Sequence, residues 1–142
     1  MNTTLRTAAL FAALAAVSAA HAQTATALPA DKVLPSGVAL KWTAVGAGAK
    51  PLATDTVQVH YRGTLPDGKE FDSSFKRGEP TSFPLNRVVP CWTQALQEMK
   101  VGDTADITCP PATAYGERGI PNVIPGNTVL KFQVQLLAVK GK

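Results

Sequence analysis

Residues 55–74 read DTVQVHYRGTLPDGKEFDSS, and this stretch predicts two strands joined by a tight turn. Apolar residues take every second position at its start, which is the period of a strand with one buried face. The residues on that face are Val57, Val59 and Tyr61. Pro-Asp-Gly at 66–68 is a turn signal, and the chain returns as a second strand over 69–72. Such a pair is typical of an antiparallel sheet that covers a core on one side.

Segments on both sides of this hairpin alternate in the same way and predict further strands. They span residues 38–44, 103–109 and 128–139. One segment, from Cys91 or Trp92 to Lys100, has a helical period instead. Its apolar residues, at i, i+3, i+4 and i+7, are Trp92, Ala95, Leu96 and Met99. The sequence therefore predicts an α+β fold, in which an antiparallel sheet packs its apolar face on one short helix.

The first 22 residues predict a secretory signal peptide. Arg6 gives a positive start, an apolar run follows, and Ala20-His21-Ala22 is a small-x-small cleavage site. An uncleaved anchor helix is the alternative, but the apolar run is shorter than the roughly 20 residues that span a bilayer. We therefore expect a periplasmic or secreted protein that is cleaved after Ala22 and has no membrane anchor. A flexible arm over 23–35 and one domain over 36–142 would follow.

Charge and cysteine content limit the class of protein further. The net charge is +4, and the positive residues are scattered rather than clustered, so we expect no nucleic-acid partner. The two cysteines are Cys91 and Cys109. In an oxidising compartment an even cysteine count favours a disulfide, and only one pairing exists. Two separate buried thiols and a thiol-dependent redox function are the alternatives.

Few side chains could support covalent or metal chemistry. Once the signal peptide leaves, His60 is the only histidine, and alternation places it on the polar face of its strand. A Ser-His-Asp triad or a multi-histidine metal site is therefore hard to build, and no phosphate-binding glycine motif is present. We expect no metal and no cofactor. Asp72, at the end of a strand beside two serines, either caps a turn or has a functional role.

Aromatic and aliphatic residues recur in ordered motifs through the rest of the chain. The motifs are VHYRGTLPDGKEFDSS (59–74), KRGEPTSFPLNRVVPCW (76–92), AYGERG (114–119) and VIPGNTVLKFQVQLL (123–137). In these motifs and their order the chain resembles the FKBP-type peptidyl-prolyl cis-trans isomerases, and most closely the exported bacterial group that includes the macrophage infectivity potentiators. The resemblance runs from about Ser36 to Val139 and implies a twisted five- or six-stranded antiparallel sheet wrapped around one short helix.

The resemblance also implies an apolar pocket that binds proline. Its walls would be Tyr61, Phe71, Phe83, Val88, Val89, Ile124 and Phe132, with Trp92 as the floor and Val123 at the rim. Asp72 and Tyr115 would be the polar groups, and the backbone N–H of Ile124 would be a further donor to a ligand. Of these residues, the catalytic set would be Asp72, Tyr115, Trp92 and Phe132.

The implied activity is cis-trans isomerisation of X-Pro bonds (EC 5.2.1.8) without covalent, metal or cofactor catalysis. Its partners would be proline-containing exported polypeptides, and macrolides such as rapamycin and tacrolimus would bind. A periplasmic chaperone with incidental isomerase activity is the alternative, because both roles would use the same pocket. Cys91 and Cys109 stand where the family often has glycine and an aliphatic residue, which strengthens the disulfide interpretation.

Overall fold

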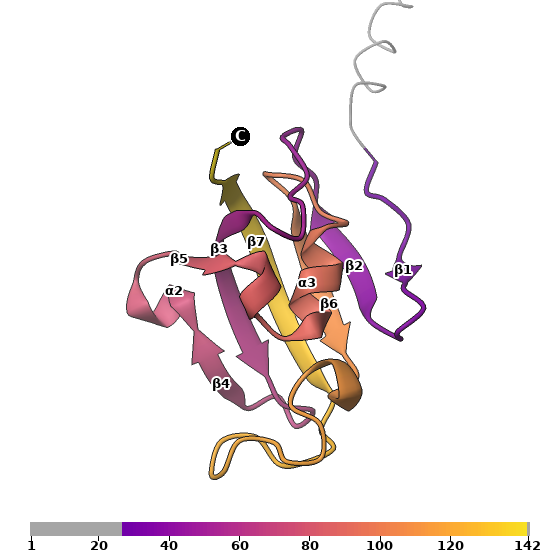
Figure 1. Cartoon of the computed structure of the whole chain (residues 1–142), viewed down its shortest axis with the longest axis vertical. Coiled ribbons are helices and arrows are strands. Elements are labelled where there is room, and N and C mark those ends of the chain that lie inside the picture. The colour runs from indigo at the N-terminus through magenta and orange to yellow at the C-terminus, as the bar shows by residue number, and fades with distance from the viewer. Residues whose placement is uncertain (1–26, 142) are drawn as a thin grey trace, which may run out of the picture.

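The computed structural model describes residues 27–141, in which one antiparallel sheet carries the helix α3 on one face (Figure 1). The predicted signal peptide lies outside the described residues. The sheet has seven strands in the order β1-β2-β6-β7-β3-β4, and β5 pairs separately with β3. The strands are β1 (Lys32–Val33), β2 (Ala39–Ala44), β3 (Thr56–Thr64), β4 (Glu70–Ser73), β5 (Thr81–Pro84), β6 (Thr104–Cys109) and β7 (Leu130–Val139). The helices are α2 (Ser74–Arg77) and α3 (Pro90–Leu96), with 3-10 turns at Leu85–Arg87 and Pro111–Thr113.

The predicted fold class is confirmed, and the alternating segments are the long strands. β3 lies at the centre of the pocket half of the sheet, because it pairs with β4, β5 and β7. Two short strands were not predicted. β5 falls in a stretch rich in Gly and Pro, and β1 falls in the expected flexible arm, where it pairs antiparallel with β2.

Helix α3 packs its apolar side on the sheet as its period predicts. Trp92, Ala95, Leu96 and Met99 are all buried. The helix is shorter than predicted, however, and ends at Leu96 rather than near Lys100. The N–H of Glu98 and that of Met99 bond to carbonyls three residues earlier, so the chain tightens into turns before Gly102.

A disulfide fixes the start of α3 to the end of β6. Cys91 and Cys109 are bonded, both side chains are fully buried, and their Cα atoms are 5.6 Å apart. Cys91 directly precedes Trp92, and Cys109 directly precedes the loop that carries Tyr115. The bond therefore ties together two segments that build the pocket described next. Among residues 27–141, no helix has the length and apolar character needed to cross a bilayer.

Candidate active site

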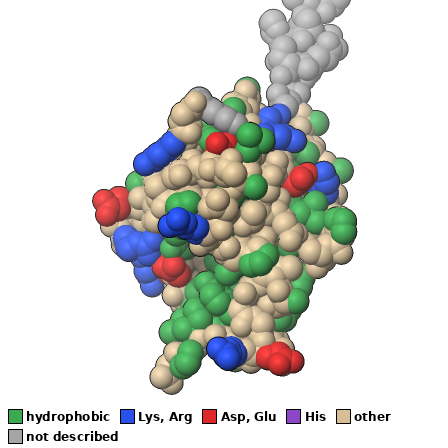
Figure 2. Space-filling view, viewed as in Figure 1, with side chains coloured by type: hydrophobic (Ala, Val, Ile, Leu, Met, Phe, Trp, Pro, Cys, Tyr) green, Lys and Arg blue, Asp and Glu red, His purple; other side chains and the backbone are tan. Residues whose placement is uncertain are grey.

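An aromatic pocket of about 360 Å³ lies between the start of α3 and the half of the sheet built by β3, β4 and β5. Figure 2 shows hydrophobic side chains gathered in this lower part of the molecule, near β4 and the loop between β6 and β7. The lining residues are Tyr61, Phe71, Asp72, Phe83, Arg87, Val88, Val89, Trp92, Tyr115 and Phe132. Nine of these ten residues were predicted from the sequence; the tenth is Arg87.

Trp92 is the centre of the ring cluster. Its indole meets the rings of Tyr61, Phe83 and Phe132 edge to face, with centroids 5.2, 5.3 and 5.3 Å away. Edge-to-face contacts of this kind hold rings in fixed orientations, each worth about 0.5–1.5 kcal/mol beyond burial. The pocket floor is therefore rigid and apolar before any ligand arrives.

The indole N–H of Trp92 is buried and has no hydrogen-bond partner in the described chain. An unpaired buried donor costs about 1–3 kcal/mol, so such groups are rare outside functional sites. Trp92 therefore contributes its shape and apolar surface to the pocket floor, and its indole makes no hydrogen bond within the described fold.

Gly63 lets two of the rings meet. A Cβ at this position would lie 2.5 Å from Phe71 Cζ and 2.9 Å from Phe132 Cε1. The rings of Phe71 and Phe132 pack edge to face with centroids 5.6 Å apart over the bare backbone of β3. A glycine is therefore needed inside this strand because the two pocket rings approach its backbone closely.

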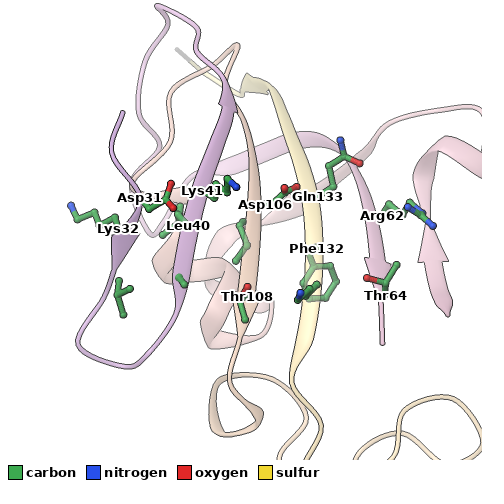
Figure 3. Close-up of a pocket in the computed structure, with 14 residues that line it drawn as sticks. Asp31, Lys32, Leu40, Lys41, Arg62, Thr64, Asp106, Thr108, Phe132 and Gln133 are labelled. Carbon is green, nitrogen blue, oxygen red and sulfur yellow. The ribbon is translucent and has the colours of Figure 1, made fainter. Parts of the chain in front are cut away.

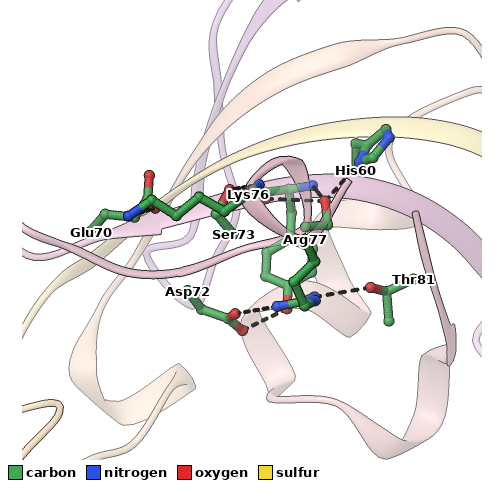
Figure 4. Close-up of polar contacts among 9 residues, drawn as sticks. His60, Glu70, Asp72, Ser73, Lys76, Arg77 and Thr81 are labelled. Atoms are coloured by element: carbon green, nitrogen blue, oxygen red, sulfur yellow. Dashed lines mark hydrogen bonds and ion pairs between the residues drawn. The ribbon is translucent and has the colours of Figure 1, made fainter. Parts of the chain in front are cut away.

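The polar side of the pocket is a closed triangle of hydrogen bonds among Tyr61, Asp72 and Arg77, and Figure 4 labels Asp72 and Arg77. The hydroxyl of Tyr61 donates to Asp72 Oδ2 at 2.5 Å, and Arg77 Nη1 donates to Asp72 Oδ1 at 2.7 Å. Arg77 Nη2 donates to the Tyr61 hydroxyl and to Thr81 Oγ1, both at 3.1 Å. The carboxylate of Asp72 is thus held in one orientation at the edge of an apolar pocket.

This triangle determines the protonation of its members. Burial raises the pKa of Asp72, but the hydrogen bonds from Tyr61 and Arg77 outweigh it and leave the pKa below the usual value. Burial, and then the bond to Asp72, raises the pKa of Tyr61. Asp72 is therefore a carboxylate and Tyr61 a neutral phenol at neutral pH, so neither is poised for proton transfer.

Asp72 does not cap the following turn. Ser73 performs that task, since its side chain accepts a hydrogen bond from Lys76 N at the start of α2. The Asp72 side chain lines the pocket instead. Arg77 was not predicted from the sequence, because its pairing with Asp72 depends on the single turn of α2, which brings Arg77 back toward Asp72. The only signal in the sequence was a basic residue five positions after Asp72.

Two further polar groups at the pocket, in addition to the Trp92 indole N–H and the Arg87 side chain, are unpaired in residues 27–141. The hydroxyl of Tyr115 makes no hydrogen bond, and burial followed by the charge of Asp72 raises its pKa, so it is a neutral donor. The backbone N–H of Val89, just before α3, also makes none. Both groups are free to donate to the carbonyls of a bound peptide.

The prediction that the N–H of Ile124 serves this purpose is wrong. That N–H donates to the carbonyl of Ile120 at 2.8 Å within the loop, and Ile124 is buried outside the pocket lining. Val123 is exposed and likewise does not line the pocket. His60, as expected for a structural residue, faces Ser74 with Nδ1 2.8 Å from Oγ, and its ring stacks on Phe75.

A second hollow lies on the outer face of the sheet and differs in character (Figure 3). It is a groove of about 580 Å³ among the outward side chains of β2, β6, β7 and β3, including Lys41, Asp106 and Gln133. Its lining mixes charged, polar and aliphatic side chains, and Lys32 and Arg62 are engaged in ion pairs with Glu98 and Glu70. No cluster of three or more metal-ligating side chains occurs in either hollow or elsewhere in the described chain.

Comparisons with known proteins identify the family of this chain. The family profile described as FKBP-type peptidyl-prolyl cis-trans isomerase matches residues 48–137. The chain is 52% identical over 105 residues to the FKBP-type peptidyl-prolyl cis-trans isomerase FkpA of Aeromonas hydrophila, covering 74% of this chain and 39% of the relative. It is 46% identical over 114 residues to the peptidyl-prolyl cis-trans isomerase Mip of Coxiella burnetii, covering 80% and 50%. The chain thus spans half or less of the length of these relatives.

Solved structures give the same result. A peptidyl-prolyl cis-trans isomerase from Pseudomonas syringae pv. tomato is 40% identical with a TM-score of 0.73, covering 78% of this chain and 81% of the other. FkpA from Escherichia coli is 46% identical with a TM-score of 0.74, covering 78% and 51%. The chain belongs to the family of FKBP-type peptidyl-prolyl cis-trans isomerases.

Proposed function

We propose that this domain catalyses cis-trans isomerisation of X-Pro bonds by binding the proline over Trp92 in the aromatic pocket. The observation that carries the proposal is the pocket itself: a rigid floor of edge-to-face rings beside a carboxylate whose hydrogen bonds are already committed. Such a pocket offers shape and low polarity, but it has no nucleophile beside a general base.

Bond rotation is a reaction that such a pocket can accelerate. The barrier to rotation of a peptide bond is about 18–20 kcal/mol and comes from lost resonance. The planar amide shifts charge onto its oxygen, and the twisted amide loses this shift and is less polar. An apolar pocket therefore penalises the planar state more than the twisted one, which is selective stabilisation of the transition state. The two isomers of X-Pro bonds are close in energy, so the pocket needs to lower only the barrier.

Each group of the pocket has a role in this scheme. Trp92, Phe83 and Phe132 grip the proline ring, and Phe71 closes the wall beside Phe132. The Tyr115 hydroxyl and the Val89 N–H hold substrate carbonyls on either side of the proline. Asp72 acts through its field and its fixed orientation on the twisting amide, and no proton moves.

Turnover of a Leu-Pro peptide, with and without rapamycin, tests the proposal. Two-dimensional exchange NMR on the peptide measures cis-trans exchange directly and needs no coupling protease. We expect exchange to speed up in proportion to enzyme concentration and to return to the uncatalysed rate when rapamycin is added. A peptide that exchanges at the same rate with and without the protein would contradict the assignment.

The substrates we propose are proline-containing polypeptides that fold after export, in the periplasm or outside the cell. The predicted signal peptide supports this location. So does the buried disulfide, since such bonds persist in oxidising compartments. Fractionation of cells that express the full chain, with the mature N-terminus sequenced, checks both location and cleavage after Ala22.

A further inference from the structure

Arg87 is a charge at the pocket that nothing in the described chain neutralises. Its side chain lines the pocket beside Val88 and Val89 and is exposed. It belongs to none of the ion pairs of residues 27–141. The other charged groups at this edge, Asp72 and Arg77, bind each other at 2.7 Å. The pocket edge therefore carries one uncompensated positive charge.

We propose that Arg87 sets the sequence preference of this domain, by attracting an acidic side chain one or two residues from the substrate proline. The inference rests on the proposed isomerase function and adds a substrate class to it. A peptide whose proline lies over Trp92 must leave the pocket past its edge, and an extended chain advances about 3.3 Å per residue. Residues that flank the proline thus come within reach of the long Arg87 side chain, while the Asp72–Arg77 pair offers them no net charge.

The expected size of the preference follows from the exposure of Arg87. Ion pairs between exposed groups are worth a fraction of a kcal/mol to about one, which corresponds to a two- to fivefold change in kcat/KM. Because exposed charges are screened, the preference should shrink as salt rises from about 20 mM to about 500 mM. A preference that comes from shape alone would not depend on salt.

The experiment compares matched peptides of the form Xaa-Leu-Pro-Zaa by exchange NMR. One series carries Glu, Ala or Lys before the Leu-Pro unit, and a second series carries them after it. The measured quantity is the ratio of kcat/KM for the Glu and Lys peptides within each protein, which is independent of overall activity. We expect a two- to fivefold ratio in favour of Glu in at least one series for the wild type. Arg87→Gln should bring this ratio to about one, and Arg87→Glu should invert it.

Lys41→Glu is the matched control, because Lys41 is an exposed cation on the opposite, outer face of the sheet. Lys41→Glu changes the net charge by the same amount as Arg87→Glu. Because this change lies on the face away from the pocket, the wild-type ratio of kcat/KM for the Glu and Lys peptides should stay the same. Equal ratios in wild type and Arg87→Gln in both series, or a ratio that Lys41→Glu shifts as much as Arg87→Glu, would overturn the proposal. The Ala peptides distinguish a failure of this proposal from a failure of the proposed isomerase function. If the enzyme turns over the Ala peptides but shows no preference between the Glu and Lys peptides, only the role of Arg87 is refuted.

Discussion

Removing the disulfide between Cys91 and Cys109 should lower the free energy of unfolding by about 3 kcal/mol. The two cysteines are 18 residues apart in sequence, and cross-linking them removes loop-closure entropy from the unfolded chain. The chain-entropy relation for a loop of this length gives about 3 kcal/mol at 25 °C. For a domain of this size that corresponds to a fall in Tm of roughly 10–15 °C.

The assay is urea unfolding followed by tryptophan fluorescence on three samples: oxidised wild type, reduced wild type and the Cys91→Ala/Cys109→Ala variant. Because both sulfurs are buried, reduction should be done on the unfolded chain, which is then refolded in reductant. Reduced wild type keeps both sulfur atoms in place. The difference in free energy of unfolding between the oxidised and reduced proteins therefore measures the contribution of the cross-link alone. The alanine variant should be equally or less stable, since the missing sulfur atoms leave space in the core.

A difference of less than about 1 kcal/mol in the free energy of unfolding between oxidised and reduced wild type would mean that the cross-link stabilises the fold far less than loop closure predicts. Equal stability of the alanine variant and the oxidised protein would lead to the same conclusion. Either result would mean that packing alone holds the start of α3 on the end of β6.

Three further results are expected. Asp72→Asn removes the carboxylate at the pocket edge and should reduce kcat/KM about tenfold, near 1.4 kcal/mol, in the peptide exchange assay; unchanged activity would argue against a field effect. Since the folded pKa of Asp72 is lowered, its ionisation stabilises the fold above the unfolded pKa of about 3.9, and this contribution is lost as pH falls through the folded pKa. The stability difference between wild type and Asp72→Asn, measured by urea unfolding at stepped pH, should therefore shrink below about pH 4; a constant difference would contradict the lowered pKa. Gly63→Ala should push Phe71 and Phe132 apart, lower the free energy of unfolding by about 1–3 kcal/mol and reduce activity. Gly68→Ala is the control: Gly68 has a φ of +90° and no atom near the position of an added Cβ, so this substitution should lower stability but not activity.

The sequence was sufficient for the elements with a long regular pattern. β3 alternates over its whole length, and the apolar positions Trp92, Ala95 and Leu96 follow the helical period within α3, so both were predicted with their faces correctly placed. β5 could not be found in this way, because its four residues follow a Gly- and Pro-rich turn and none of them is fully buried. Its pairing with β3 nevertheless places Phe83 opposite Val57 and so turns that ring toward Trp92.

The candidate site was predictable as a set of rings but not as a set of hydrogen bonds. Motifs placed the rings of Tyr61, Trp92 and Phe132 together, since strands and helix fix their directions. Backbone donors follow local loop geometry instead. The N–H of Ile124, which had been expected to bind ligand, donates to the carbonyl of Ile120 in the bridge between these two residues. The backbone N–H at the pocket that has no partner in the described chain is that of Val89.

The kcat/KM values of variants that lack one ring test whether the ring cluster around Trp92 performs the catalysis. Trp92→Leu and Phe132→Leu keep the pocket apolar but remove the edge-to-face contacts, and Phe75→Leu removes an exposed ring outside the pocket as a control. With folding checked by circular dichroism, we expect both pocket variants to lose more than about tenfold in kcat/KM, at least 1.4 kcal/mol, and Phe75→Leu to keep wild-type activity. Full activity in folded Trp92→Leu and Phe132→Leu would mean that the rings are not needed for catalysis.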